Sequence, residues 1–346
     1  MTYKARVGRI LEHGMATCNR ARSASSMKRV SPRLLPILHV ALVLLAAPLL
    51  VAFRFGDIAS DTVDWPIAEF PEPSGIAYHP ARASLFIVGD EGDIGEVSLE
   101  GKLLRMSHLG GDLEGITVDP RSGLLYVVRE GHEVIFEVRP DNFKLVRRFT
   151  IDRSYQGDPN YLRRGGDGIE GLTFVSDEKD PEGGRLWAVN QYDPPVLIEL
   201  AISLKSSKEK YQVARIMRAI PVDAAPLSGV TWNSESREFF VTSALWMRVV
   251  VLDADGKVER SVRIPAFMPE GMTRVPDGRV VIAQDSGGLV LWKPDGDPFR
   301  AEPAVGPPAS TERSGAASGS PASLPVAAAV SVTTPALEGA APGHRQ

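Results

Sequence analysis

The sequence predicts an all-β fold, a five-bladed β-propeller that follows an N-terminal transmembrane helix. A short motif recurs five times between residues 73 and 273, and β-rich runs follow each copy. A run of 20 uncharged residues also stands near the N-terminus, and the chain ends in a segment of low complexity. Repeats with a period of about 40 residues or more and several strands each are typical of propellers.

The N-terminal segment predicts a membrane anchor. Residues 34–53 carry no charge and are about long enough to cross a bilayer as a helix. Basic residues before this run indicate that residues 1–33 stay in the cytoplasm. We therefore expect an uncleaved signal anchor in a bacterial plasma membrane, with the remaining chain on the periplasmic or extracellular side. A cleaved signal peptide is the alternative, because a weak cleavage-like Ile58-Ala59-Ser60 follows. Met27 begins a compact basic leader, which makes residues 1–26 a candidate start-site extension.

The repeated motif defines the blades. It reads apolar residue or proline, Glu or Ser, Gly, aliphatic residue or Met, then Thr or Ala. Each copy precedes further β-rich runs, which are bounded by turn residues. Four antiparallel strands per repeat predict one propeller blade each. The five copies occupy residues 73–77, 113–117, 169–173, 227–231 and 269–273.

The last repeat ends before a fourth strand, so we expect residues 62–70 to complete it and close the ring. The propeller then spans residues 57–300, with surface insertions at 152–166, 176–184 and 203–211. Residues 301–346 are rich in Ala, Pro, Ser and Gly, which predicts a disordered tail. Two alternatives stay open: an open β-sandwich or barrel, and a divergent sixth repeat within residues 140–168.

Composition excludes several classes of function. Net charge is −4 and no basic stripe appears, so nucleic acid is not an expected partner. Cys18 is the single cysteine and precedes the apolar run, which excludes disulfides and cysteine-based metal sites from the fold.

The motif predicts a metal site on the propeller axis. Its glycines allow the inner strands to approach closely. The residue before the glycine is Glu in three copies and Ser in two, and pseudo-fivefold symmetry would gather these positions around the axis. Three converging carboxylates require protonation or a cation, and an oxygen-only site suits calcium. The predicted metal ligands are Glu114, Glu170 and Glu270, with Ser74 and Ser228 as further channel residues.

A second polar ring is predicted where the second strands end. These residues are candidates for channel-lining or metal-supporting groups, and the alternative is that they are ordinary turn residues. They are Asp90, Glu130, Asn190, Gln191, Gln284 and Asp285.

The motif region resembles the SdiA-regulated family, the YjiK-like bacterial proteins. The similarity rests on residues 113–117 with 125–130, residues 168–172 and residues 269–272, and it covers about 70–300. The resemblance implies a five-bladed propeller of the NHL/TolB-like kind behind an N-terminal membrane segment, and bound calcium. It implies no enzymatic activity. Ser74 and Ser228 depart from the glutamate pattern, which puts the set of ligands in doubt.

These observations favour a non-catalytic module that binds calcium in its channel and an unknown protein or small molecule on its face. The alternative is a calcium-dependent hydrolase, a lactonase or a phytase-like esterase, with the metal in the same channel. A lactonase requires a base near the metal, and His132 is the one histidine near a strand end. A phytase requires clustered cations, and Arg129, Arg163 and Arg164 are suggestive. We assign no catalytic residue from the sequence.

Overall fold

A computed structural model describes residues 62–65, 70, 72–163, 168–205, 209–294, 297 and 299. The described chain is all-β, with 20 strands and no helix. Within these ranges, therefore, nothing meets the length and hydropathy that a membrane-spanning helix requires. The predicted leader 1–33, anchor 34–53 and tail 301–346 lie outside the described residues.

The strands follow the four-strand repeat expected from the sequence. The inner strands are β2 (Pro73–His79), β6 (Leu113–Val118), β10 (Ile169–Ser176), β14 (Leu227–Asn233) and β18 (Pro269–Arg274). The second strands are β3 (Ser84–Gly89), β7 (Leu125–Arg129), β11 (Gly184–Asn190), β15 (Glu238–Ser243) and β19 (Val280–Gln284). The third strands are β4 (Asp93–Val97), β8 (Val134–Val138), β12 (Val196–Ala201), β16 (Arg248–Asp253) and β20 (Leu289–Trp292). The outer strands are β5 (Leu103–His108), β9 (Leu145–Ile151), β13 (Tyr211–Pro221), β17 (Val258–Arg263) and β1 (Thr62–Trp65).

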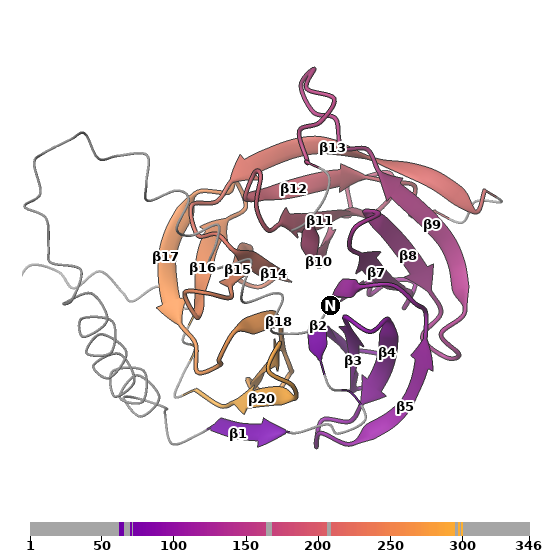
Figure 1. The fold of residues 1–346 in the computed structure, drawn as a ribbon. Coiled ribbons are helices and arrows are strands. Elements are labelled where there is room, and N and C mark those ends of the chain that lie inside the picture. The colour runs from indigo at the N-terminus through magenta and orange to yellow at the C-terminus, as the bar shows by residue number, and fades with distance from the viewer. Residues whose placement is uncertain are drawn as a thin grey trace, which may run out of the picture. The chain divides into compact units, whose positions relative to one another are not determined.

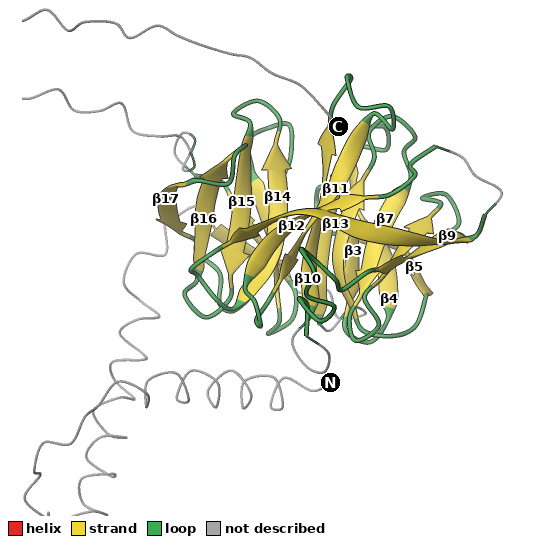
Figure 2. Cartoon of the chain, turned by 90° about the horizontal axis from the view of Figure 1, so that it is seen from above, coloured by secondary structure: helices red, strands yellow, loops and turns green. Residues whose placement is uncertain are grey.

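Each run of four strands is an antiparallel meander, and the sheets stand radially about a common axis (Figures 1 and 2). This arrangement is propeller-like and not that of a sandwich. The long strand β13 also pairs in parallel with β9, which joins two meanders into one eight-stranded sheet. Within 140–163 and at 168, the part of that segment that the structure describes, β9 is the only strand. Strand β1 pairs with β20 and lies within the segment 62–70 assigned to the last repeat.

The motif glycines form a closed ring around the axis. A Cβ atom at any of them would lie 2.3–2.7 Å from an atom of the next inner strand, which no side chain tolerates. The contacts run from β2 through β6, β10, β14 and β18 back to β2. The expectation that glycine permits close approach of the strands is therefore confirmed. The five glycines are Gly75, Gly115, Gly171, Gly229 and Gly271.

The threonine column of the motif links neighbouring inner strands, a role that sequence analysis did not predict. Thr173 Oγ1 accepts the backbone N–H of Trp232 at 2.9 Å. Since this bond crosses from β10 to β14, it fixes the register between sheets. Equivalent bonds join Thr117 to Phe174 N (3.1 Å), Thr273 to Tyr78 N (3.2 Å) and the Thr231 hydroxyl to the Met272 carbonyl.

We expect Thr173→Val to lower the free energy of unfolding by about 1–3 kcal/mol, because the Trp232 N–H loses its acceptor. Urea denaturation measures the change. Thr150→Val makes the same substitution on the exposed side of β9 and serves as the control. Equal stability of the two variants would show that the Thr173 bond contributes nothing.

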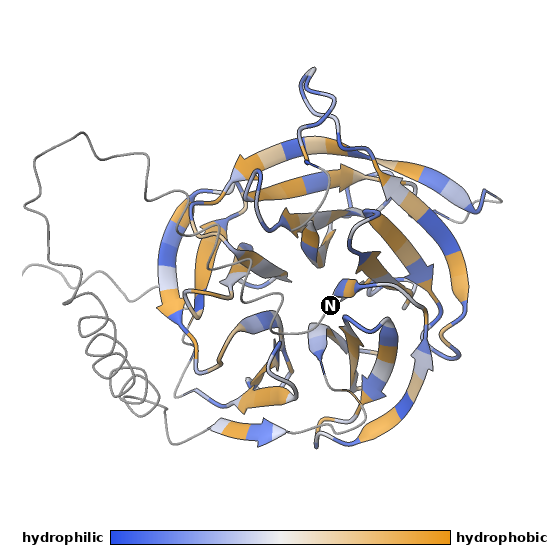
Figure 3. Ribbon diagram, in the orientation of Figure 1, coloured by the Kyte–Doolittle hydropathy of each residue, from blue (hydrophilic) through white to orange (hydrophobic). Residues whose placement is uncertain are grey.

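The hydrophobic core fills the spaces between sheets. Phe86 of the first sheet meets Phe143 of the next edge to face, with ring centroids 6.1 Å apart. The outer strands instead alternate between partly buried and exposed residues, as β5 and β17 show. Polar and apolar residues both occur along these strands (Figure 3). Large apolar side chains therefore stabilise the stacking of sheets, and the outer strands face solvent.

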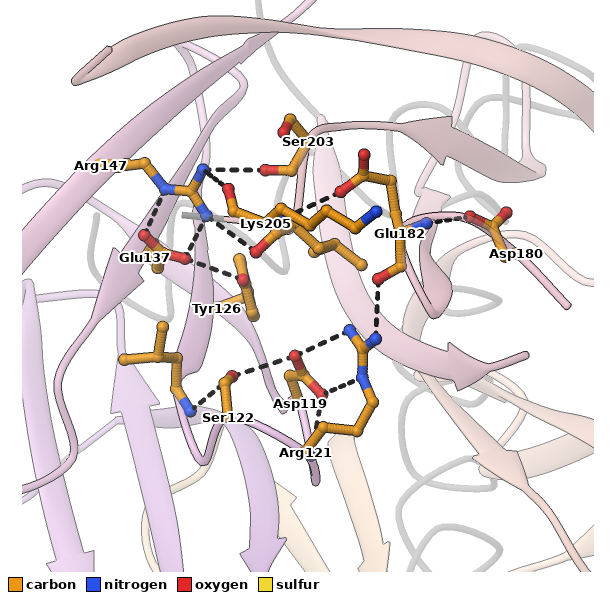
Figure 4. Close-up of polar contacts among 12 residues, drawn as sticks. Asp119, Arg121, Ser122, Tyr126, Glu137, Arg147, Asp180, Glu182, Ser203 and Lys205 are labelled. Atoms are coloured by element: carbon orange, nitrogen blue, oxygen red, sulfur yellow. Dashed lines mark hydrogen bonds and ion pairs between the residues drawn. The ribbon is translucent and has the colours of Figure 1, made fainter. Parts of the chain in front are cut away.

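Arginines connect consecutive sheets at the periphery. Arg147 of β9 is 4% exposed and bonds Glu137 through Nε and Nη2, both at 2.5 Å (Figure 4). Its Nη1 donates to the carbonyls of Ser203 and Lys205, in the turn before β13, at 2.9 and 3.0 Å. Three other arginines reach carbonyls of the next sheet's turn in the same way: Arg105 at Pro140 and Asp141, Arg218 at Ala254 and Asp255, and Arg279 at Leu99.

Glu96 of β4 is a second buried carboxylate that arginines bind, and its pKa is lowered. Burial alone raises the pKa of this carboxyl, but hydrogen bonds from Arg82, Ser84 and Arg105 outweigh it and bring the pKa to about 2. Because the folded pKa lies below the unfolded value near 4.5, the carboxylate contributes fully above pH 4.5. This contribution is lost as pH falls from about 4.5 to about 2.

We expect the loss across that window to reach about 3 kcal/mol. Chemical denaturation of wild type and Glu96→Gln between pH 7 and pH 2 isolates it, because the other acids cancel in the difference. The stability gap between the two proteins should narrow with acidification. A constant gap would contradict the assignment.

Candidate metal centre

Each inner strand carries a β-bulge at the residue before the motif glycine. The pairing of inner and second strands shifts register at this point in all five meanders. A bulge re-aims a side chain away from the regular alternation of a strand. The five re-aimed residues are all 1–3% exposed: Ser74, Glu114, Glu170, Ser228 and Glu270.

Three carboxylates meet at one of these bulges. Asp90 follows β3, Asp112 precedes β6, and Glu114 occupies the bulge in β6. One carboxylate oxygen from each lies within 4.8 Å of the others. The Ser74 hydroxyl donates to Asp90 Oδ1, so a second bulge residue fixes this carboxylate. We call Asp90, Asp112 and Glu114 the acid cluster.

The acid cluster differs from the set of equivalent glutamates predicted from the motif. Glu170 and Glu270 are buried, but neither belongs to a carboxylate cluster of this kind among the described residues. Ser228 does not point to a ligand site either, because its hydroxyl donates to the Pro269 carbonyl at 2.7 Å and bridges β14 to β18. Sequence analysis missed Asp112, whose only signal was its place directly before the second motif copy.

The residues of the second polar ring have different local roles. Gln284 Oε1 accepts the Phe267 N–H at 2.9 Å, and the Asn190 amide donates to the carbonyls of Tyr192 and Pro194. These two side chains hold turns in place. Glu130 Oε1 accepts the Gly168 N–H at 3.1 Å, at the start of the third inner strand. The remaining ring residues, Asp90, Gln191 and Asp285, are 3–7% exposed at the same ends of their strands.

The acid cluster has the chemistry of a hard-cation site. All its donors are carboxylate oxygens, which calcium prefers, and it contains no His or Cys. Asp112 Oδ1 is buried and accepts no hydrogen bond within the described chain. Burying a carboxylate oxygen without a hydrogen-bond partner costs free energy, and a bound cation would replace the missing partner. The residues therefore fit a divalent cation.

Among the described residues, two candidate catalytic groups named from the sequence lie outside the acid cluster. His132 is exposed and contributes no atom to the acid cluster. The Arg129 guanidinium lies over the Phe136 ring at 5.4 Å, and within the described ranges it forms no ion pair. At the opposite end of the inner strands lies an axial cavity of about 190 Å³, lined by uncharged residues that include Thr117, Thr173 and Thr273.

Comparisons with known proteins add a partial family match. A family model described as Phytase-like, esterase-like activity of phytase, matches residues 68–197, less than half of the chain. A search of curated proteins found no match.

Several solved structures are similar at low identity. Myxococcus xanthus glutaminyl cyclase is 16% identical over 68% of this chain and 97% of its own, with a TM-score of 0.47. Virginiamycin B lyase from Staphylococcus aureus is 14% identical over 68% of this chain and 74% of its own, with a TM-score of 0.38.

Proposed function

We propose that this chain is a five-bladed propeller that binds a calcium-like divalent cation through Asp90, Asp112 and Glu114. The observation that carries the proposal is the convergence of three carboxylates at a bulge, where the buried Asp112 Oδ1 accepts no hydrogen bond from any residue that the structure describes. Five meanders of four strands and the closed ring of glycines support the blade count. The protein acts as a binding module whose face with the acid cluster receives a protein or small molecule.

We also propose a location for this binding module. We place the propeller outside the cytoplasm, tethered to a bacterial plasma membrane by residues 34–53, on the hydropathy and charge of the sequence alone. The resemblance to SdiA-regulated proteins points in the same direction.

Metal-dependent ester hydrolysis is the second candidate function, and the Phytase-like match over residues 68–197 favours it. A divalent cation bound at the acid cluster would polarise an ester carbonyl or phosphoryl oxygen. Asp90, Asp112 and Glu114 would hold the cation, and Ser74 would orient Asp90 through its hydroxyl.

Calorimetric titration of the purified full-length chain with calcium tests the proposal. We expect one site with a dissociation constant in roughly the micromolar to millimolar range. Absence of binding, or unchanged binding in Asp112→Asn, would overturn the proposal. A parallel assay with aryl esters and phosphomonoesters, with and without chelator, decides between the two functions, because only a hydrolase shows chelator-sensitive turnover.

A further inference from the structure

Exposed apolar side chains lie on the same mouth of the propeller as the acid cluster. Leu245 and Trp246 occupy the turn after β15 and are 37% and 59% exposed. That turn is equivalent to the one that follows β3 and carries Asp90. Phe267 is 41% exposed and lies two residues before β18, at the end where Asp112 directly precedes β6. We call Leu245, Trp246 and Phe267 the aromatic rim.

Several contacts fix the aromatic rim beside the start of the inner strands β14 and β18. Trp246 Nε1 donates to the Ala225 carbonyl at 3.1 Å, just before inner strand β14. The Phe267 N–H donates to the side chain of Gln284, a residue of the second polar ring. Ala244 and Met268 are buried and pack together, which brings the two segments of the rim side by side. The rim is therefore one patch at the end of the inner strands where the acid cluster lies.

This mouth of the propeller carries mostly negative charge. Six buried acids lie at this end of the strands: Asp90, Glu114, Glu133, Glu170, Glu270 and Asp285. Of the nearby arginines, Arg153 pairs with Glu133 and Arg163 with Asp193. Arg129 lies over an aromatic ring, and Arg248 begins β16, two strands from the inner strand. One divalent cation offsets two of the negative charges, so a polyanion approaching the mouth meets repulsion.

The geometry points to a ligand of stated chemistry: an uncharged ester or related carbonyl compound that carries an apolar acyl or aryl group. A cation held by the acid cluster would attract its carbonyl oxygen, and its apolar part would pack on Trp246 and Phe267. Aromatic side chains with one exposed face are suited to such contacts. This inference rests on the proposed cation site. It selects neutral esters over phosphate esters, either as substrates or as ligands that are bound without reaction.

Nuclear magnetic resonance of the tryptophan indole N–H groups tests the inference without requiring turnover. The full-length chain with saturating calcium is titrated with butyrophenone, an uncharged ketone that mimics a phenyl ester and is not hydrolysed. A second titration uses phenyl phosphate, which carries the same ring and a negative charge. The Trp246 signal is assigned by its loss in Trp246→Phe.

We expect butyrophenone to shift the Trp246 signal and phenyl phosphate to leave it unchanged. Phe267→Ala should weaken butyrophenone binding about tenfold, the loss typical of removing an aromatic contact. Tyr211→Ala removes an aromatic residue that is 72% exposed on outer strand β13, and it should have no effect.

The inference is overturned if phenyl phosphate shifts the Trp246 signal. It is also overturned if neither compound shifts that signal. Calcium binding is measured separately by calorimetry, so a mouth that binds calcium but not butyrophenone leaves the cation site intact. Absence of calcium binding would instead refute the cation site itself.

Discussion

Arg147→Leu is expected to lower the free energy of unfolding by about 3–5 kcal/mol, because it leaves a buried carboxylate without its partner. Glu137 is 1% exposed and receives two hydrogen bonds from Arg147 and one from the Tyr126 hydroxyl. The substitution also removes the donor for the carbonyls of Ser203 and Lys205. Since these carbonyls belong to the next meander, the loss weakens the contact between sheets as well. Guanidinium denaturation measures the change.

Two further variants separate the network from a general effect of the substitution. Arg139→Leu makes the same change at an exposed arginine in the neighbouring turn and should alter stability by less than about 0.5 kcal/mol. The double variant Arg147→Leu with Glu137→Leu should recover much of the loss, because no unpaired charge remains. A cost for Arg147→Leu no larger than that for Arg139→Leu would refute the role of the network.

The inner strands were predictable because their constraint is expressed in the local sequence. Each motif glycine meets the backbone of the next strand, so the same residue type recurs at every copy. Arg147 was not predictable in this way. Its partner Glu137 lies directly opposite on β8, and this pairing becomes visible only when the strand register is known. The carbonyls that Arg147 reaches lie more than 50 residues away in sequence.

The sequence predicted the chemistry of the candidate site and two of its residues, Glu114 and Asp90, but not Asp112. The motif identified Glu114 as a buried carboxylate at the axis, and the structure places it in a bulge. Symmetry suggested Glu170 and Glu270 as its partners, on the assumption that all repeats are equivalent. The surroundings of each bulge differ, however, because Asp112 lies outside the motif and Asp90 comes from the neighbouring sheet. A contact between sheets that occurs in only one repeat leaves no periodic signal in the sequence.

Glu114→Gln and Asp90→Asn are each expected to weaken calcium binding by at least about 100-fold, because each removes one negative charge from three converging ligands. Amides keep the shape and an oxygen donor, so the loss reports charge and not cavity size. Calorimetry with calcium measures the affinities, and thermal unfolding without calcium checks that each variant folds.

Glu270→Gln supplies the matched control at an equivalent bulge. Glu270 has the same residue type, the same place in the motif and nearly the same burial as Glu114, but it lies outside the acid cluster. Its substitution should therefore weaken calcium binding far less than that of Glu114. If both glutamates proved equally necessary, the cation would lie on the symmetry axis, as the motif alone predicts, and the asymmetric cluster at β6 would not be its site.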